Sequence, residues 1–188
     1  MAKAGRKPRA KTKTGMKRIE ARRLPILPES ARAFSWLHLA GFILLCELAG
    51  IVGAVFTTPN IPTWYAVLAK PAWTPPSWVF GPVWTLLYAL MGIAAYMVYR
   101  QPESAARSFG VRAFSVQLAL NVLWSAVFFG LQSPGTGFAV IELLWFVIAA
   151  CTLVFWRVSR PAALLMVPYL AWVTFAAALN YAVWILNP

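Results

Sequence analysis

Acidic residues, histidine and cysteine are scarce in this sequence, and each shortage excludes a class of chemistry. Only 5 of the 188 residues are Asp or Glu, against 17 Lys or Arg, with one histidine and two cysteines. His38 stands alone, so no ligand set with the spacing of a zinc or haem-attachment site is present. Cys46 and Cys151 lie within apolar runs, which argues against a disulfide framework and against an activated thiol. We therefore predict no metal site and no catalytic residue.

Catalytic and nucleotide-binding motifs are also missing. The sequence contains no GxSxG elbow, HExxH motif, P-loop or dinucleotide-binding glycine pattern. Glu47 and Glu142 are the only acids within apolar segments, and an intramembrane carboxylate is a candidate proton relay, ligand partner or interhelical hydrogen-bonding group. Two carboxylates on separate helices do not by themselves make an acid–base pair. Whether the protein is an enzyme stays open, and the absence of these motifs argues against it.

The residues that are abundant are apolar. The sequence is 61% hydrophobic and 12% charged, with a mean hydropathy of +0.67, and a soluble domain carries roughly twice that charged fraction. Five apolar segments each approach the ~20 residues that a bilayer-spanning helix needs, and short turns make consecutive helices antiparallel. We predict an all-α integral membrane protein in which residues 34–188 form a five-transmembrane-helix bundle. The predicted spans are 34–57, 78–99, 111–131, 136–157 and 162–186.

Positive charge is concentrated in the first 33 residues. They hold eleven Lys or Arg and two Glu, which leaves only +3 of the net +12 for the remainder of the chain. Because this tail is poor in apolar residues, we expect residues 1–33 to be disordered. We interpret the tail as a solvated arm near anionic lipid headgroups, with organelle targeting as the alternative. Nucleic acid is not an expected partner, because no aromatic residues alternate with the basic ones.

The remaining charges predict the orientation in the membrane. If the tail is inside, five spans place residues 100–112 and 157–160 inside as well, and the loop 58–77 outside. The inner side then holds sixteen basic residues and the outer side only Lys70. Cytoplasmic loops carry such an excess of Lys and Arg. We predict a multi-pass protein of a bacterial cell membrane with a cytoplasmic N-terminus, an organelle membrane being the alternative.

Four of the segments carry aromatic and polar residues at helical spacing. Because unpaired polar groups are costly in lipid, these stripes should face the interior of the bundle. They either line a cavity suited to a flat, mostly apolar ligand or form hydrogen bonds between helices in a filled core. The stripes are Trp84, Tyr88 and Gly92; Gln117, Asn121, Trp124 and Phe128; Glu142, Trp145, Ala149, Thr152 and Trp156; and Tyr169, Trp172, Ala176 and Asn180.

The segment Trp64–Tyr88 has the most distinctive composition, with four tryptophans and four prolines in 25 residues. Each proline fixes its own backbone angle and restricts the residue before it, so the loop should be stiff. Tryptophan offers a large flat surface and one N–H donor, which suits a membrane interface or a flat ligand. The segment therefore predicts a lid over an intramembrane pocket.

These residues resemble those of the TspO/MBR family, also called tryptophan-rich sensory proteins or translocator proteins. The resemblance covers about residues 36–188 and leaves out the basic tail. It rests on Trp64-Tyr65, on Lys70-Pro71-x-Trp73-x-Pro75-Pro76-x-Trp78-Val79-Phe80-Gly81-Pro82-Val83-Trp84-Thr85-x-x-Tyr88, on Gln117-x-x-x-Asn121-x-x-Trp124 with Phe128-Phe129, and on Pro168-Tyr169-Leu170-x-Trp172 followed by Leu179-Asn180.

The resemblance implies a bundle, often a homodimer, whose pocket beneath the first loop binds porphyrins and other tetrapyrroles as ligands, with no cofactor. The implied role is a tetrapyrrole-binding sensor, regulator or carrier linked to pigment metabolism, the alternative being a light-dependent porphyrin-degrading enzyme. An alternating-access transporter is less favoured, because no internal repeat is evident. Cholesterol binding is not carried over, because no basic residue follows Tyr181. The implied pocket residues are Trp64, Tyr65, Trp84, Asn121, Trp124, Trp172 and Ala176.

Overall fold

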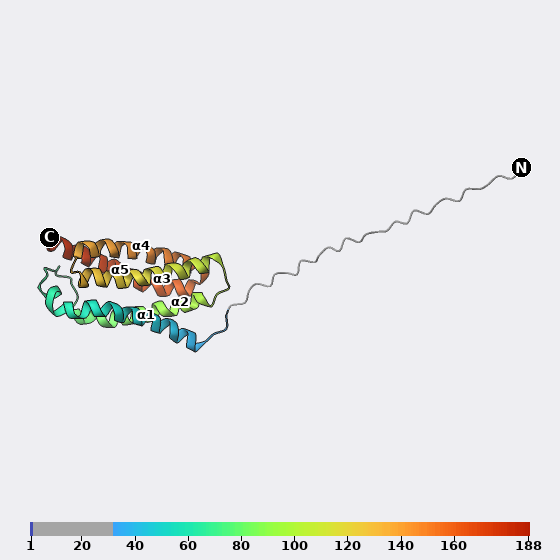
Figure 1. The fold of residues 1–188 in the computed structure, drawn as a ribbon, viewed down its shortest axis with the longest axis horizontal. Coiled ribbons are helices and arrows are strands. Elements are labelled where there is room, and N and C mark those ends of the chain that lie inside the picture. Colours follow the sequence, from blue (N-terminus) through green and yellow to red (C-terminus); the bar gives the residue numbers. More distant parts are fainter. Residues whose placement is uncertain (2–31) are drawn as a thin grey trace.

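Five long helices run side by side and antiparallel in the computed structural model, which describes Met1 and residues 32–188 (Figure 1). All five are long and apolar enough to cross a membrane, which confirms the predicted all-α five-helix bundle. The predicted disorder of the tail concerns residues that lie almost entirely outside the described part of the chain. The helices are α1 (Trp36–Thr57), α2 (Phe80–Tyr99), α3 (Ala105–Ser125), α4 (Pro134–Val158) and α5 (Arg160–Leu186).

Local sequence signals explain where the helices begin. Helix α3 begins six residues before the predicted span, because the Ser104 side chain caps it by accepting a hydrogen bond from the backbone N–H of Arg107 at 3.1 Å. Hydropathy alone misses this polar first turn. Helices α4 and α5 each carry a proline in the first turn, where a missing N–H costs nothing.

Short helices extend or connect the long ones. Between α1 and α2 the chain forms η1 (Thr58–Asn60) and η2 (Ile61–Tyr65), passes through an irregular proline-rich stretch, and forms η3 (Ser77–Val79). At the end of α3 the helix widens into the π-helical turn η4 (Ala126–Gly130). The loop from η1 to η3, the α3–α4 turn and the C-terminus therefore share one end of the antiparallel bundle (Figure 1).

Helix α1 lies at the edge of the bundle, and the other four surround the core. It buries only Cys46 and Gly53, and it packs on α2 and α3. Helix α5, by contrast, buries ten residues, and it packs on α4 and α2. Residues of α2, α4 and α5 such as Met91, Ile148 and Tyr169 are fully buried and form the core. The weakly packed α1 is thus the wall at which a cavity is easiest to open.

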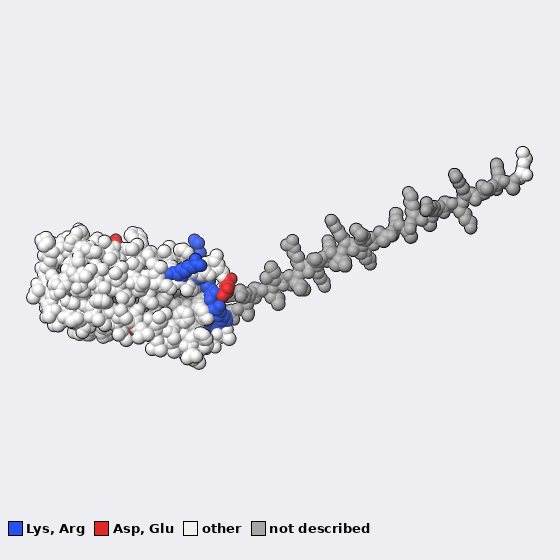
Figure 2. Space-filling model, in the orientation of Figure 1, with Lys and Arg blue, Asp and Glu red and all other residues white. Residues whose placement is uncertain are grey.

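Charge is distributed unevenly along the bundle axis. Figure 2 shows Lys and Arg side chains gathered at one end of the bundle, the end at which α1 begins. The opposite, loop-bearing end carries Lys70 alone among the basic residues that the structure describes. The described basic residues at the end where α1 begins are Arg32, Arg100, Arg107, Arg112, Arg157 and Arg160.

Candidate ligand-binding site

A cavity of about 440 Å³ lies between the helices beneath the α1–α2 loop. Its inner end is formed by buried residues, among them Tyr88 of α2, Asn121 of α3 and Ala176 of α5. Its outer end is covered by Tyr65 of η2. The volume falls within the roughly 300–1,000 Å³ usual for small-molecule sites.

The cavity opens sideways between α1 and the beginning of α2. Ile51 and Trp78 line it but are 60% and 74% exposed, so the cavity is not closed off at these residues. A side-chain carbon added at Gly81, which also lines this part, would meet nothing within 4 Å. The cavity therefore has a side opening between α1 and the beginning of α2, apart from the loop.

Two stacked pairs of aromatic rings form much of the wall. The Trp84 ring stacks on Tyr88 with 5.5 Å between centroids and 30° between planes. Trp124 stacks on Phe128 with 5.3 Å and 26°. All four residues line the cavity, which gives it large flat apolar surfaces of the kind that bind planar ligands.

The polar groups at the inner end are already hydrogen-bonded to one another. The Tyr88 hydroxyl donates to Oδ1 of Asn121, and Nδ2 of Asn121 donates to the Tyr169 hydroxyl at 3.2 Å. The Tyr169 hydroxyl in turn donates to Oε1 of Gln117 at 2.9 Å. Because both ends of its amide are engaged, the Asn121 side chain is fixed in orientation. A ligand meets a preorganised dipole there rather than a free donor.

A second polar link fixes Trp124. Its indole N–H donates to Oδ1 of Asn180 at 3.0 Å, and Nδ2 of Asn180 donates to the Pro134 carbonyl at 2.7 Å. The Trp124 ring is therefore held against the cavity by helices α4 and α5 through a single asparagine. This leaves its ring face, rather than its N–H, for contact with a ligand.

Two sets of contacts stabilise the loop above the cavity, one within the loop at Lys70 and one between the loop and the C-terminus at Asn187. The ammonium group of Lys70 donates to the carbonyls of Tyr65, Leu68 and Ala66 at 2.6, 2.8 and 3.2 Å, and lies 4.8 Å from the Tyr65 ring centroid. Asn187, after α5, accepts a hydrogen bond from the backbone N–H of Ala69 at 3.0 Å and donates one to its carbonyl at 2.9 Å. These contacts hold the predicted lid in place over the cavity.

Replacing Lys70 with methionine should loosen this loop while leaving the bundle intact, because methionine keeps most of the apolar stem but donates to no carbonyl. A charge-assisted hydrogen bond contributes about 1.5–3 kcal/mol, and part of that is lost to solvent here. We expect amide hydrogen exchange in residues 66–77 to accelerate at least about tenfold, which corresponds to ~1.4 kcal/mol. Arg112→Met, at the other end, should leave the loop unchanged. Wild-type exchange in the Lys70 variant would contradict this role.

The structure brings five of the seven implied pocket residues to the cavity wall and leaves two outside it. Trp64 packs edge-on against Phe128, 5.5 Å between centroids, and does not line the cavity. Trp172 packs against Phe80 at 5.8 Å, and Phe80 forms the wall there instead. Helical spacing places Trp172 and Ala176 on the same face of α5. It does not show that Phe80 of α2 lies between Trp172 and the cavity. The five that line the cavity are Tyr65, Trp84, Asn121, Trp124 and Ala176.

Helix α1 contributes more to the cavity than sequence reasoning indicated. Glu47, which the sequence marked as an intramembrane carboxylate, lines the cavity together with Gly50 and Ala54, which sequence reasoning did not assign to it. Gly50 lies against the Tyr88 ring, where a side chain would collide with it. The available signal was the series of small residues in α1. Pairs of small residues four positions apart occur in several segments of this sequence, however, and such a pair does not show which helix packs against it.

The expectation that the Glu142 stripe of α4 faces the interior was wrong. Helix α4 buries other residues, including Ile148 and Cys151, and contributes nothing to the cavity wall. The indole N–H of Trp145 donates to the Thr174 hydroxyl of α5 at 2.8 Å. The Trp145 N–H is thus hydrogen-bonded at the seam between α4 and α5 rather than inside the bundle.

Comparison with known proteins places these features in a family. The model of the TspO/MBR family matches residues 42–185, which spans all five helices. The tryptophan-rich protein TspO of Chlorobaculum tepidum is 47% identical over 156 residues, covering 81% of this chain and 97% of that protein. The translocator protein of Homo sapiens is 40% identical over 153 residues, 79% of this chain and 89% of its own length. The tryptophan-rich sensory protein of Cereibacter sphaeroides is 38% identical over 152 residues, which cover 81% of this chain and 92% of that protein. This chain belongs to the TspO/MBR family.

Proposed function

We propose that this membrane protein binds a porphyrin or related tetrapyrrole in the cavity beneath the α1–α2 loop and acts as a sensor, regulator or carrier of that pigment. The observation that carries the proposal is the wall formed by two stacked pairs, Trp84 on Tyr88 and Trp124 on Phe128. A flat conjugated macrocycle gains most from such surfaces, since ring stacking adds about 0.5–1.5 kcal/mol per pair beyond area burial.

The shape and polarity of the cavity suit a flat amphiphilic molecule. A porphyrin is apolar over its faces and carries carboxylates at one edge. The inner end of the cavity offers fixed, paired polar groups, while Thr58 and Ser77 bring hydroxyl groups to its outer part. Trp78 lies in η3 at the loop-bearing end of the bundle, so a charged edge beside it can reach the aqueous interface, which avoids burying an unpaired carboxylate.

The names of the relatives favour roles in sensing and carrying. One is a tryptophan-rich sensory protein and another a translocator protein, and the match to each covers nearly all of that protein's length. We propose that the protein lies in a bacterial cell membrane as a homodimer, with the arginine-rich end of Figure 2 on the cytoplasmic side. The pocket then lies in the outer half of the bilayer.

A protoporphyrin titration of the purified protein, kept dark in detergent, tests the proposal. Wild-type protein should bind saturably near one site per chain. Trp84→Ala combined with Trp124→Ala removes one ring from each stacked pair and should weaken binding at least about tenfold, the ~1.4 kcal/mol expected from losing two ring contacts. Equal melting temperatures of the free proteins would show that the variant folds.

The matched control removes two tryptophans that lie elsewhere. Trp36 and Trp156 are 77% and 47% exposed and do not line the cavity. Their double alanine variant should retain wild-type affinity. Equal, non-saturating uptake by wild type and both variants would reject the pocket, because the pigment would then only partition into micelle and protein surface.

A further inference from the structure

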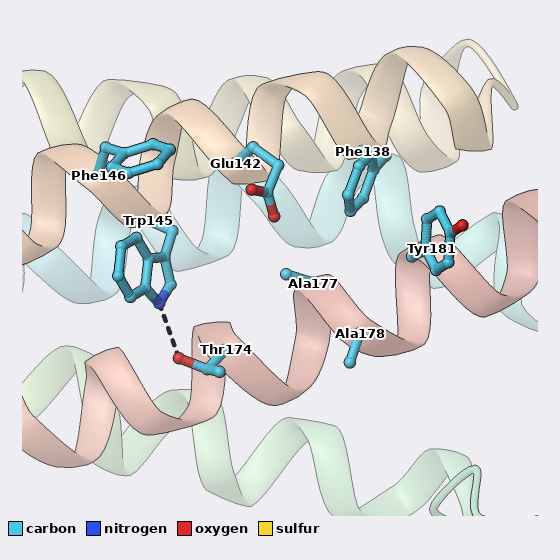
Figure 3. Close-up of a pocket in the computed structure, with 8 residues that line it drawn as sticks. All are labelled: Phe138, Glu142, Trp145, Phe146, Thr174, Ala177, Ala178 and Tyr181. Carbon is cyan, nitrogen blue, oxygen red and sulfur yellow. Dashed lines mark hydrogen bonds between the residues drawn. The ribbon is translucent and has the colours of Figure 1, made fainter.

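A second concavity, separate from the cavity, lies on the outer side of the bundle between α4 and α5 (Figure 3). Its volume is about 370 Å³. Figure 3 shows the Glu142 side chain directed from α4 into this groove, toward the small residue Ala177 of α5. No α4 residue lines the cavity beneath the loop, so this groove belongs to a different site.

The Glu142 carboxylate has no partner within residues 32–188. No hydrogen bond or ion pair of the described chain involves it, although two polar groups stand nearby in the groove. These are the Trp145 indole N–H and the Thr174 hydroxyl, which bond to each other at 2.8 Å, as the dashed line in Figure 3 marks. Arg157, the arginine of the same helix, is fifteen residues further on, about 22 Å along the axis.

The position of Glu142 in the membrane makes this isolation costly. It lies eight residues inside the start of α4 at Pro134, about 12 Å along the helix axis, which is well within the hydrocarbon region. A carboxylate at such depth ordinarily pairs with a cation or a strong donor. Residues 32–188 supply no positive group to Glu142, so the groove suits one that comes from another molecule.

The surrounding side chains define what kind of cation fits. Phe138, Trp145, Phe146 and Tyr181 place four aromatic rings around the groove, and aromatic faces attract organic ammonium groups. Phe146 is 61% exposed and the floor is formed by alanines, so an apolar body can lie along the groove and continue into the lipid. We propose that this groove binds an amphiphilic amine from the bilayer, with its protonated amino group on the Glu142 carboxylate.

Within residues 32–188, a second copy of this chain offers no free positive group for this groove. The basic residues of the described chain lie near helix ends or in loops, and all but Lys70 are at the end far from this groove. Lys70 is already engaged with three backbone carbonyls. Among these candidates, the Glu142 carboxylate is complementary to a small cationic amphiphile rather than to residues 32–188 of another protomer.

Bromine quenching of tryptophan fluorescence tests this proposal on the full chain in phosphatidylcholine vesicles. The probe is a dodecylamine brominated in the middle of its chain, so that the bromine lies near Trp145 when the amino group is at Glu142, and the matched probe is the alcohol brominated at the same position. Subtracting the quenching of a Trp145→Phe variant isolates the signal from Trp145. We expect the amine to quench Trp145 saturably at a concentration at least about tenfold below that of the alcohol.

Two charge-matched variants decide the outcome. Glu142→Gln should abolish the preference for the amine, whereas Glu103→Gln, which removes a carboxylate from the loop at the other end, should retain it. A third variant, Ala178→Phe, fills the groove without touching Glu142 and should block quenching by both probes. The proposal is overturned by equal quenching by amine and alcohol, by a preference that survives in Glu142→Gln, or by no quenching at all, which would mean that lipid or a second copy already fills the groove.

Discussion

Replacing Gly92 with leucine should leave little or no folded protein. A Cβ atom at this position in α2 would lie 2.6 Å from the Cα atom of Ile43 and 2.9 Å from the carbonyl oxygen of Phe42, both in α1. These are backbone atoms, which cannot rotate away, so the helices must separate. Overpacking by a few carbons already costs about 1–3 kcal/mol, and a leucine against backbone exceeds this, within a typical total stability of about 5–15 kcal/mol.

The matched control for this prediction is Gly41→Leu. Gly41 lies in α1, where an added Cβ would meet nothing within 4 Å, so the substitution adds a side chain on the exposed surface. We expect wild-type yield of monodisperse protein in detergent and an unchanged melting temperature for Gly41→Leu, against aggregated or unrecoverable protein for Gly92→Leu. Recovery of Gly92→Leu with a wild-type melting temperature would contradict the close approach of the two helices.

The close approach at Gly92 also explains the shape of the cavity. Helix α1 contacts α2 at backbone distance near Gly92, and at Gly50 it still lies against the Tyr88 ring. Further toward the loop, at Ile51 and Gly81, the cavity between the helices is open to the outside. Because α1 buries few residues of its own, these small-residue contacts hold the cavity wall in position.

The number and type of helices followed from the sequence because bilayer thickness imposes a length and a composition that each segment meets. Arg107 shows the limit of that reasoning. It lies in the first turn of α3 and is nearly buried, where its guanidinium pairs with Glu103 at 3.2 Å. Hydropathy treats such a residue as loop, whereas a serine cap and a salt bridge make it part of the helix.

Periodicity predicted which residues share a helix face, but not which neighbour that face meets. In α3 the stripe of Asn121 and Trp124 does line the cavity. In α4 an equally regular stripe, with Trp145 on it, lies along the outer seam, because Thr174 of α5 satisfies its N–H there. The two stripes differ in how each helix is rotated about its axis relative to its neighbours. That rotation depends on the packing of all the helices and cannot be read from the residues of one stripe.

Replacing Ala176 with phenylalanine should abolish tetrapyrrole binding while the bundle stays folded, under the function proposed above. Ala176 is nearly buried, and its methyl group borders a cavity of about 440 Å³, so a phenyl ring can enter empty space instead of displacing core residues. The ring would then occupy the volume needed by a planar ligand between Trp84 and Trp124. Titration with protoporphyrin should show at least about a hundredfold loss of affinity, ~2.7 kcal/mol, with an unchanged melting temperature.

The control is two residues further along the same helix and distinguishes the two proposed sites. Ala178 is exposed and lines the outer groove, so Ala178→Phe adds the same ring to the same helix without reaching the cavity. Ala178→Phe should retain porphyrin affinity and block the groove to the amine probe, whereas Ala176→Phe should lose porphyrin affinity and leave the groove open to the amine probe.

The two variants together locate the pigment. Loss of porphyrin binding in Ala178→Phe alone would assign the tetrapyrrole to the surface between α4 and α5, and would leave the aromatic cavity without its proposed ligand. Loss in Ala176→Phe alone would assign the pigment to the ring-lined interior, since both variants add one phenyl ring to the same helix.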